Sequence, residues 1–212
     1  MTDLHAVAAT LTRELSARYA STVVGPDHLG AVIARGLLRT LSAAIPGAAP
    51  VVDALLARAD RVSVTIPLLA GGCLVVLSPA AVADPLGRCE VVAHEHQHAA
   101  VIARDADLDV IVDYLGSGEL RALREAEAYA VGMWARYLLS GALPDLAHET
   151  AALSSDTYHL AGADVATARA TLESHLDTMR AGAVPPLRVC RDVLEILAAH
   201  HPEAIVPEEH RV

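Results

Sequence analysis

VVAHEHQHAA, residues 91–100, places three histidines and one glutamate within five positions of an otherwise apolar run. Imidazoles and carboxylates cost free energy when they are buried without partners, so these side chains need solvent or a partner. No Pro or Gly interrupts the flanking residues, which favours a helix. A strand with His94, His96 and His98 on one face is the alternative, but it requires Ala, Glu and Gln in a strand and gives Glu95 no role.

The stretch matches the pattern His-Glu-x-x-His at His94, Glu95 and His98. Each helical residue turns by about 100°, so the two histidines lie one turn apart and both imidazoles can reach one metal ion. Glu95 lies beside them, where its carboxylate can take a proton from a metal-bound water. His96 faces away and is expected to be a bystander or an outer-shell group. A satisfied or solvent-facing histidine pair is the alternative interpretation, because so short a pattern also arises by chance.

A third ligand is expected downstream, because catalytic zinc usually has three protein ligands. Residues 120–139 read LRALREAEAYAVGMWARYLL and are predicted to be a helix that carries Glu125 and Glu127. The two glutamates point in different directions on a helix, so at most one of them is a ligand. A solvated charged face is the alternative, since several arginines lie nearby.

HEHQH, followed 27 residues after His98 by the sequence EAEA at 125–128, resembles the gluzincin metallopeptidases. The order of predicted elements and motifs is most similar to that of the ImmA/IrrE-like and other small members. In these proteins strands precede the H-E-x-x-H helix, and a glutamate in an E-x-x-A pattern completes the zinc site. The resemblance covers about residues 60–140. It implies that Zn²⁺ is held by His94, His98 and Glu125. It also implies that Glu95 is the general base of peptide-bond hydrolysis.

Cys73 offers a different third ligand. It lies in the segment GGCLVVLSP, upstream of the histidines. Peptide deformylases also place a Gly-Cys-Leu segment before H-E-x-x-H, and GAAP at 47–50 faintly matches their first motif. A deformylase-like hydrolase that uses Cys73 is therefore a third option, beside a small buried strand residue without chemical function.

The rest of the chain has mainly the hydrophobic periodicity of helices. RVSVTIPL (61–68) alternates apolar and polar residues and CLVVLSP (73–79) is β-branched, which predicts a hairpin or two adjacent strands, the only convincing β signal. Ser117 is expected to cap the helix that Pro144 ends, and Asp164 to cap a later one. Helices are predicted over residues 3–20, 27–45, 50–59, 88–104, 118–140, 162–182 and 185–201.

These segments predict a mostly helical α+β fold. A small β-sheet or hairpin would pack on a zincin-like pair of helices, with extra helices at both ends. We expect residues 1–212 to form a single domain. Its parts would be N-terminal helices (1–60), a zincin-like metal core (61–141) and C-terminal helices (142–212).

Composition argues against several classes of partner. The formal net charge is −10, and the 16 basic residues are all scattered arginines. Without a basic stripe, neither nucleic acid nor an anionic membrane surface is an expected partner. Three distant cysteines and the absence of a signal-peptide or membrane-span pattern favour a cytoplasmic location. Nothing in the pattern indicates an oligomeric state.

The sequence therefore predicts a zinc-dependent metallopeptidase that acts on a peptide or protein substrate. A metal-activated water would attack, with Glu95 as general base. Tyr158 or His159 could supply an oxyanion donor from a later loop, but the sequence selects neither. The alternative from a different class is a non-catalytic helical protein whose metal site serves stability or partner binding.

Overall fold

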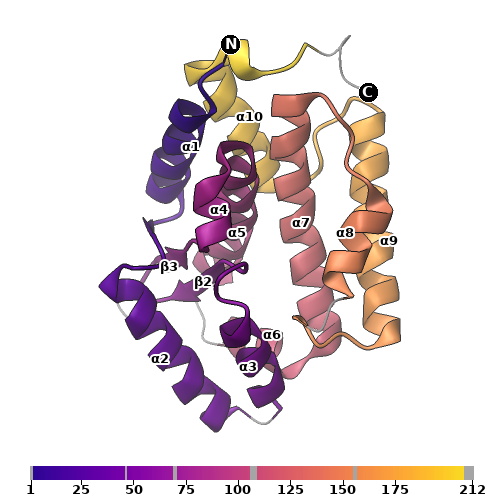
Figure 1. Cartoon of the computed structure of the whole chain (residues 1–212). Helices are drawn as coiled ribbons and strands as arrows, with labels where there is room; N and C mark the ends of the chain where they lie inside the picture. The colour runs from indigo at the N-terminus through magenta and orange to yellow at the C-terminus, as the bar shows by residue number, and fades with distance from the viewer. Residues whose placement is uncertain (1, 46, 69–70, 106–108, 155–156, 208–212) are drawn as a thin grey trace.

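The computed structural model describes residues 2–45, 47–68, 71–105, 109–154 and 157–207, and within them the chain is a mostly helical α+β fold (Figure 1). This confirms the predicted fold class. The strands are β1 (Ser21–Val24), β2 (Val64–Pro67) and β3 (Cys73–Val76). The helices are α1 (Leu4–Arg18), α2 (Leu29–Ala44), α3 (Ala49–Ala57), α4 (Pro79–Ala83), α5 (Pro85–Asp105), α6 (Asp109–Gly116), α7 (Gly118–Ser140), α8 (Leu146–Leu153), α9 (Gly162–Arg180) and α10 (Arg188–His200), followed by a 3-10 turn at Pro202–Ala204.

The sheet has the order β1-β3-β2, which makes β2 an edge strand. β2 and β3 pair antiparallel, as the predicted hairpin requires. β1 pairs in parallel with β3, with Ser21 opposite Cys73 and Val24 opposite Val76. The expectation that residues 1–60 are only helical was therefore wrong. β1 is four residues long, too short to show an alternating pattern, and its pairing partner lies far along the chain.

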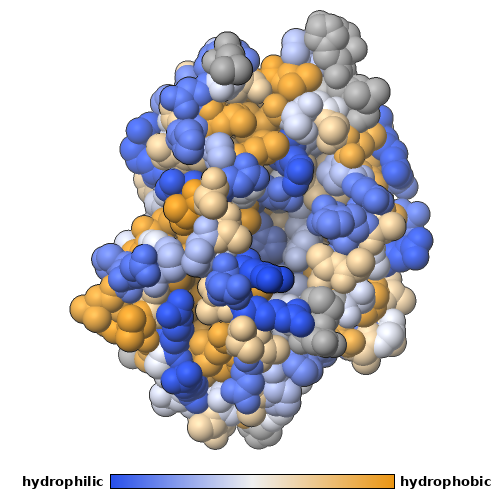
Figure 2. Space-filling view, in the orientation of Figure 1, coloured by the Kyte–Doolittle hydropathy of each residue, from blue (hydrophilic) through white to orange (hydrophobic). Residues whose placement is uncertain are grey.

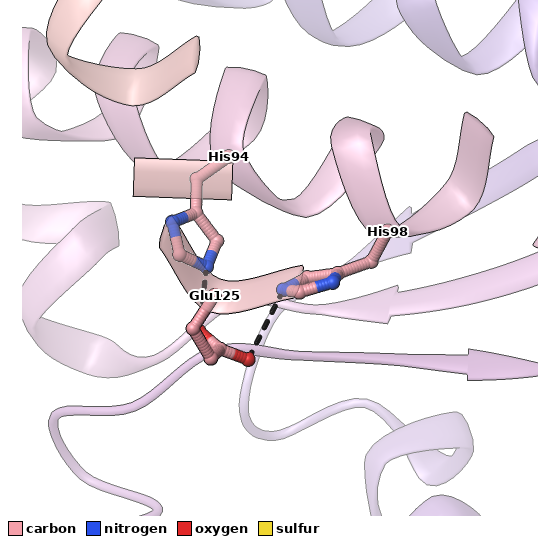
Figure 3. Close-up of side chains that lie close together, drawn as sticks. All are labelled: His94, His98 and Glu125. Carbon is pink, nitrogen blue, oxygen red and sulfur yellow. Dashed lines mark ion pairs between the residues drawn. The ribbon is translucent and has the colours of Figure 1, made fainter. Parts of the chain in front are cut away.

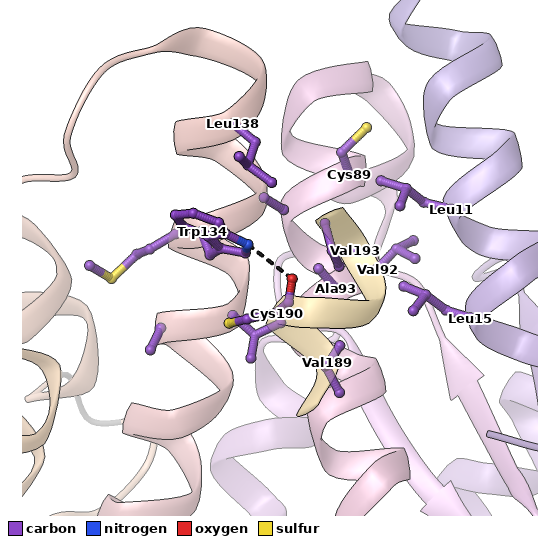
Figure 4. Packing of buried hydrophobic residues seen from close by; sticks show 14 of the residues in the cluster. Leu11, Leu15, Cys89, Val92, Ala93, Trp134, Leu138, Val189, Cys190 and Val193 are labelled. Atoms are coloured by element: carbon purple, nitrogen blue, oxygen red, sulfur yellow. Dashed lines mark hydrogen bonds between the residues drawn. The ribbon is translucent and has the colours of Figure 1, made fainter. Parts of the chain in front are cut away.

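Helices α5 and α7 pack against each other along their length and form the centre of the molecule. Gly132 on α7 permits this close approach, because a Cβ there would lie 3.2 Å from the Glu90 carbonyl oxygen and 3.6 Å from the Cβ of His94. The Trp134 indole Nε1 on α7 donates to the Cys190 carbonyl oxygen on α10 at 3.0 Å (Figure 4). α10 contacts both α5 and α7, so it packs on this central pair of helices.

Buried apolar side chains form two clusters. The main core lies among α1, α5, α7, α9 and α10, and all three predicted parts of the chain contribute to it; Figure 4 labels Leu11, Leu15, Val92, Trp134, Leu138 and Val193 within it. The second core packs α2 and α3 on the sheet, and it includes Val52, Leu55, Ile66, Val76 and Leu115. Full burial of such a side chain typically contributes about 1.5–3 kcal/mol.

The outer face of α2 stays uncovered. Leu29, Val32 and Ile33 are exposed, and apolar surface gathers over the start of α2 at the left of Figure 2. The second core is therefore bounded by a helix with apolar residues on both of its faces. Among the described residues, no helix combines the length and the apolarity that a membrane crossing needs.

The two ends of the described chain meet. Arg18 on α1 forms an ion pair with Asp192 on α10 at 2.5 Å, and the Tyr19 hydroxyl donates to the same carboxylate. Thr10 and His201 are joined by a hydrogen bond of 2.9 Å. The N- and C-terminal helices expected as additions to the metal core are thus bound to each other and packed into the main core.

The boundaries of α7 match the predicted range of 118–140. Ser117 caps the helix as predicted, and its hydroxyl accepts from the Leu120 amide. Its C-cap is Gly141, with φ of 75°, so the helix ends at a glycine that takes the left-handed conformation without strain, before Pro144 is reached. Asp164 lies inside α9 and accepts from the Ala161 amide at 3.1 Å, so it supports the N-terminus from the first turn. α4, α6 and α8 were not predicted.

Candidate metal centre

Three side chains predicted as metal ligands lie together between α5 and α7 (Figure 3). His94 and His98 stand one turn apart on α5, and Glu125 approaches from α7. His94 Nε2 lies 3.6 Å from Glu125 Oε2, and His98 Nε2 lies 3.4 Å from Glu125 Oε1. The candidate ligand atoms all lie within 4.8 Å of one another. The helical interpretation of residues 91–100 is confirmed, since the whole stretch belongs to α5.

The donor set and its spacing fit a zinc ion. Zinc ligands at about 2.0–2.1 Å in a tetrahedron stand about 3.4 Å from one another. Each histidine Nε2 lies at a similar distance, 3.4 or 3.6 Å, from one of the two Glu125 oxygens. Glu125 is 3% exposed, and its Oε2 is buried without a hydrogen-bond partner. Buried polar atoms normally have a partner, and a cation bound between this carboxylate and the two imidazoles would supply one. The site also suits other divalent metals that accept nitrogen and oxygen ligands.

Electrostatics keep Glu125 ionised. Burial alone raises the pKa of its carboxyl, but His98, His94 and the donated Tyr114 hydroxyl outweigh burial and lower the pKa to about 2. For His94, burial lowers the pKa, yet Glu125 and Glu95 outweigh it and the pKa lies above its ordinary value. The ionised Glu125 carboxylate therefore offers a negative charge to which a divalent cation can bind.

Glu95 lies beside the ligands on α5 but is not one of the group that could hold a metal. It is 3% exposed and lines the same cavity as the histidines. Its Oε2 accepts from the Thr65 hydroxyl at 2.7 Å, so edge strand β2 holds the carboxylate in place. No sequence signal pointed to Thr65, because this contact depends on how β2 packs on α5.

His96 faces the other way, as predicted for a bystander. Its Nδ1 lies 2.7 Å from the Val92 carbonyl oxygen, which can only accept, so Nδ1 carries the proton. Its Nε2 then accepts from the Ser21 hydroxyl at 2.8 Å. Burial lowers the pKa of His96 to about 4, which keeps the ring neutral. His96 thus joins α5 to β1 and takes no part in the candidate centre.

Three tyrosines surround the centre. The Tyr114 hydroxyl, from α6, donates to Glu125 Oε1 at 2.6 Å. The Tyr129 ring lies edge-on to His94 with centroids 5.0 Å apart, and its hydroxyl is 3.4 Å from that of Tyr158. Of the two residues considered as oxyanion donors, Tyr158 lines the cavity and His159 is exposed. Tyr114 was missed because no helix was predicted around it.

One buried guanidinium orders the loops beside the centre. Arg121 stands one turn before Glu125 on α7 and is 4% exposed. It donates to the carbonyl oxygens of Tyr114 at 2.8 Å and of Tyr158 at 2.6 Å. Because both acceptors are main-chain atoms, Arg121 fixes the backbone that carries two of the three tyrosines.

The alternative ligands lie elsewhere. Glu127 points away from the cluster, toward Arg124 and Gln97, each at 3.5 Å. Cys73 is fully buried in the main core, and burial raises the pKa of its thiol to about 11. Within the described ranges, the group that could hold a metal consists of His94, His98 and Glu125.

A cavity of about 110 Å³ adjoins the centre. His94, Glu95, His98 and Glu125 line one part of it. The remaining walls are largely aliphatic and come from α2, α3, β2, α5 and α6; they include Leu38, Leu55, Ile66, Ile102 and Ile111. The polar centre therefore opens into an apolar chamber formed by elements of the second core.

Comparisons with protein-family models, curated proteins and solved structures found nothing that matches this chain.

Proposed function

We propose that the protein is a zinc-dependent metallopeptidase of the gluzincin type. The observation that carries the proposal is the convergence of His94, His98 and Glu125, with the orphaned Glu125 oxygen among them. Glu95 adds a carboxylate in the same cavity that is not itself a ligand. Zinc bound there supplies a Lewis acid for the scissile carbonyl and lowers the pKa of its water to about 7.

Glu95 is assigned the proton transfer. Its carboxylate accepts the proton of the attacking water and passes it to the amine that leaves. The Thr65 hydroxyl occupies one lone pair of Oε2 and restricts the rotation of the side chain, so the carboxylate is oriented before a substrate arrives.

The substrate is assigned as an extended peptide. β2 is an edge strand, and its residues Val64–Pro67 line the cavity beside Glu95. An edge strand offers unpaired backbone groups to which a peptide can add as a further strand. The aliphatic walls would accept an apolar side chain next to the bond that is cut.

The two alternative functions, a deformylase-like hydrolase and a non-catalytic metal site, require different residues. A deformylase-like hydrolase needs Cys73 as a ligand, and this thiol is buried in the main core. A non-catalytic metal site needs the same three ligands but gives no role to the oriented carboxylate of Glu95.

The test is zinc content together with peptide hydrolysis for wild type, Glu95→Gln and Glu127→Gln. Wild type should hold about one zinc per chain and cleave members of a fluorogenic peptide library. Glu95→Gln should keep its zinc and lose about 10²–10⁴ in rate, the usual worth of a general base. Glu127→Gln, whose carboxylate lies outside the cluster, is the matched control and should behave as wild type.

Two results would reject the proposal. Undiminished cleavage by Glu95→Gln would remove Glu95 from the mechanism. A zinc-loaded wild type that cleaves no member of the library would favour the non-catalytic metal site.

A further inference from the structure

The two oxygens of the Glu125 carboxylate have different surroundings. Oε1 accepts a hydrogen bond of 2.6 Å from the Tyr114 hydroxyl. Oε2 is buried, has no hydrogen-bond partner, and lies 3.6 Å from His94 Nε2. Oε1 lies 3.4 Å from His98 Nε2. Each oxygen thus faces one histidine, but only Oε1 already accepts a hydrogen bond.

We infer that Tyr114 is a positioning residue of the metal centre, whose hydroxyl holds Glu125 Oε1 and leaves Oε2 as the ligand atom. Metal-binding carboxylates are commonly oriented by such a second hydrogen bond, which lowers the entropy lost on binding and selects one oxygen. The inference rests on the metal ion of the proposed function and does not depend on the reaction catalysed.

The fold fixes Tyr114 from two sides. Arg121 donates to the carbonyl oxygens of Tyr114 at 2.8 Å and of Leu115 at 3.3 Å, so it holds the end of α6 against α7. The ring of Tyr114 stands edge-on to His98, with centroids 6.2 Å apart. α7 therefore supplies both the Glu125 carboxylate and, one turn earlier, the Arg121 guanidinium. This guanidinium holds the backbone of Tyr114, whose hydroxyl donates to Glu125.

Tyr129 provides a matched control within the same centre. Its ring stands edge-on to His94, much as the ring of Tyr114 stands edge-on to His98. Its hydroxyl, however, lies beside that of Tyr158 and not on Glu125. Replacing either tyrosine by Phe keeps a ring beside a histidine, and only one of the two replacements removes a hydrogen bond to the ligand.

The experiment measures zinc and cobalt affinity by competition with a chelator for wild type, Tyr114→Phe and Tyr129→Phe. Tyr114→Phe should bind each metal about 10–100-fold more weakly, the usual effect of losing an outer-shell partner. Tyr129→Phe should stay close to wild type. Thermal unfolding of the metal-free proteins is the control that checks whether all three are folded.

The visible spectrum of the cobalt protein gives a second readout that packing alone would not change. Without the Tyr114 hydroxyl, Oε1 is free and the carboxylate can coordinate through both oxygens. The higher coordination number should weaken the visible absorption of cobalt, which is strongest in tetrahedral sites. An unchanged spectrum in Tyr114→Phe would show that the Tyr114 hydroxyl does not restrict how the carboxylate coordinates, and would overturn its positioning role.

The outcomes separate this inference from the proposed function. Equal affinities in all three proteins, or equal losses in both Phe variants, would overturn the role of Tyr114 while the metal centre stands. A wild type that binds no metal would overturn both. Weaker binding by Tyr114→Phe alone, in a protein that cleaves no peptide, would support Tyr114 and reject only the peptidase.

Discussion

The histidines of the cavity and the histidines of the packed core have the same side chain in different surroundings. His94 and His98 face Glu125, and their side chains are 15% and 17% exposed. His96, between them in sequence, is fully buried and has a partner on each ring nitrogen. His175 on α9 is a second core histidine, 9% exposed.

The charge environment separates the two groups. In the core, burial lowers the pKa of His96 and of His175, and no nearby acid reverses the effect. In the cavity, burial acts on His94 in the same direction, but Glu125 and Glu95 reverse the shift of its pKa. The two groups of histidines therefore differ in the acidic neighbours that converge on His94 and are too few or too far to do so at His96 and His175.

The largest expected effect is the loss of metal when a cavity histidine is removed. His94→Ala should hold no zinc above background after purification without chelators, because two ligands retain a catalytic zinc poorly. His96→Ala should keep about one zinc per folded chain, since its ring points away from Glu125. Metal analysis of the two purified variants makes the comparison. Similar zinc contents would mean that the cavity histidines are not ligands.

The next effect distinguishes the two glutamates of α7. Glu125→Ala removes a ligand, so its zinc affinity should fall by more than the roughly 10–100-fold that an outer-shell loss causes. Glu127→Ala removes only contacts with Arg124 and Gln97 and should change the affinity little. Chelator competition measures both affinities. A larger loss for Glu127→Ala would place the third ligand there.

A smaller effect is expected in stability when the core histidine is removed. His96→Ala leaves a cavity and removes the partners of Ser21 and Val92, so it should lower the free energy of unfolding by roughly 2–4 kcal/mol. Urea denaturation of the metal-free protein measures this loss. A change near zero would show that the hydrogen bonds of His96 do not hold α5 to β1.

The smallest effect concerns pH. Burial lowers the folded-state pKa of His175, and the acid Glu127 opposes this without cancelling it. In the unfolded chain this histidine has its ordinary pKa of about 6.5, so below that pH the unfolded state binds more protons than the folded state does. Stability should decrease on acidification, and His175→Gln should make this decrease less steep. Urea denaturation between pH 7 and pH 5 checks the slope, and equal slopes would show that His175 is solvated in the folded state.

The candidate metal ligands could be predicted from the sequence, but the residues that hold them and Glu95 in place could not. His94 and His98 share a face because of helical periodicity, and Glu125 was placed through the gluzincin resemblance. Thr65 and Tyr114 come from separate elements that reach the site only through tertiary packing. Their residue types are common on any surface, so no local pattern could mark them.

The same limit applies to the fold. Long helices such as α5 and α7 follow from periodicity, and the β2–β3 hairpin follows from alternation and its glycine turn. β1 owes its existence to pairing with β3, and α6 is held in place by Arg121, a residue of the next helix. Short elements of this kind are stabilised by partners distant in sequence, which local propensity does not encode.

The joining of α1 to α10 has a consequence for how the chain is made. Arg18 and Tyr19 can reach Asp192 only after α10 has been synthesised, because Asp192 lies 174 and 173 residues later in the sequence. Until α10 leaves the ribosome, the apolar face that α1 presents to it and the Trp134 face of α7 have no cover. Between the synthesis of α7 and that of α10, a nascent chain therefore carries exposed apolar surface, and such surface makes folding intermediates prone to aggregate.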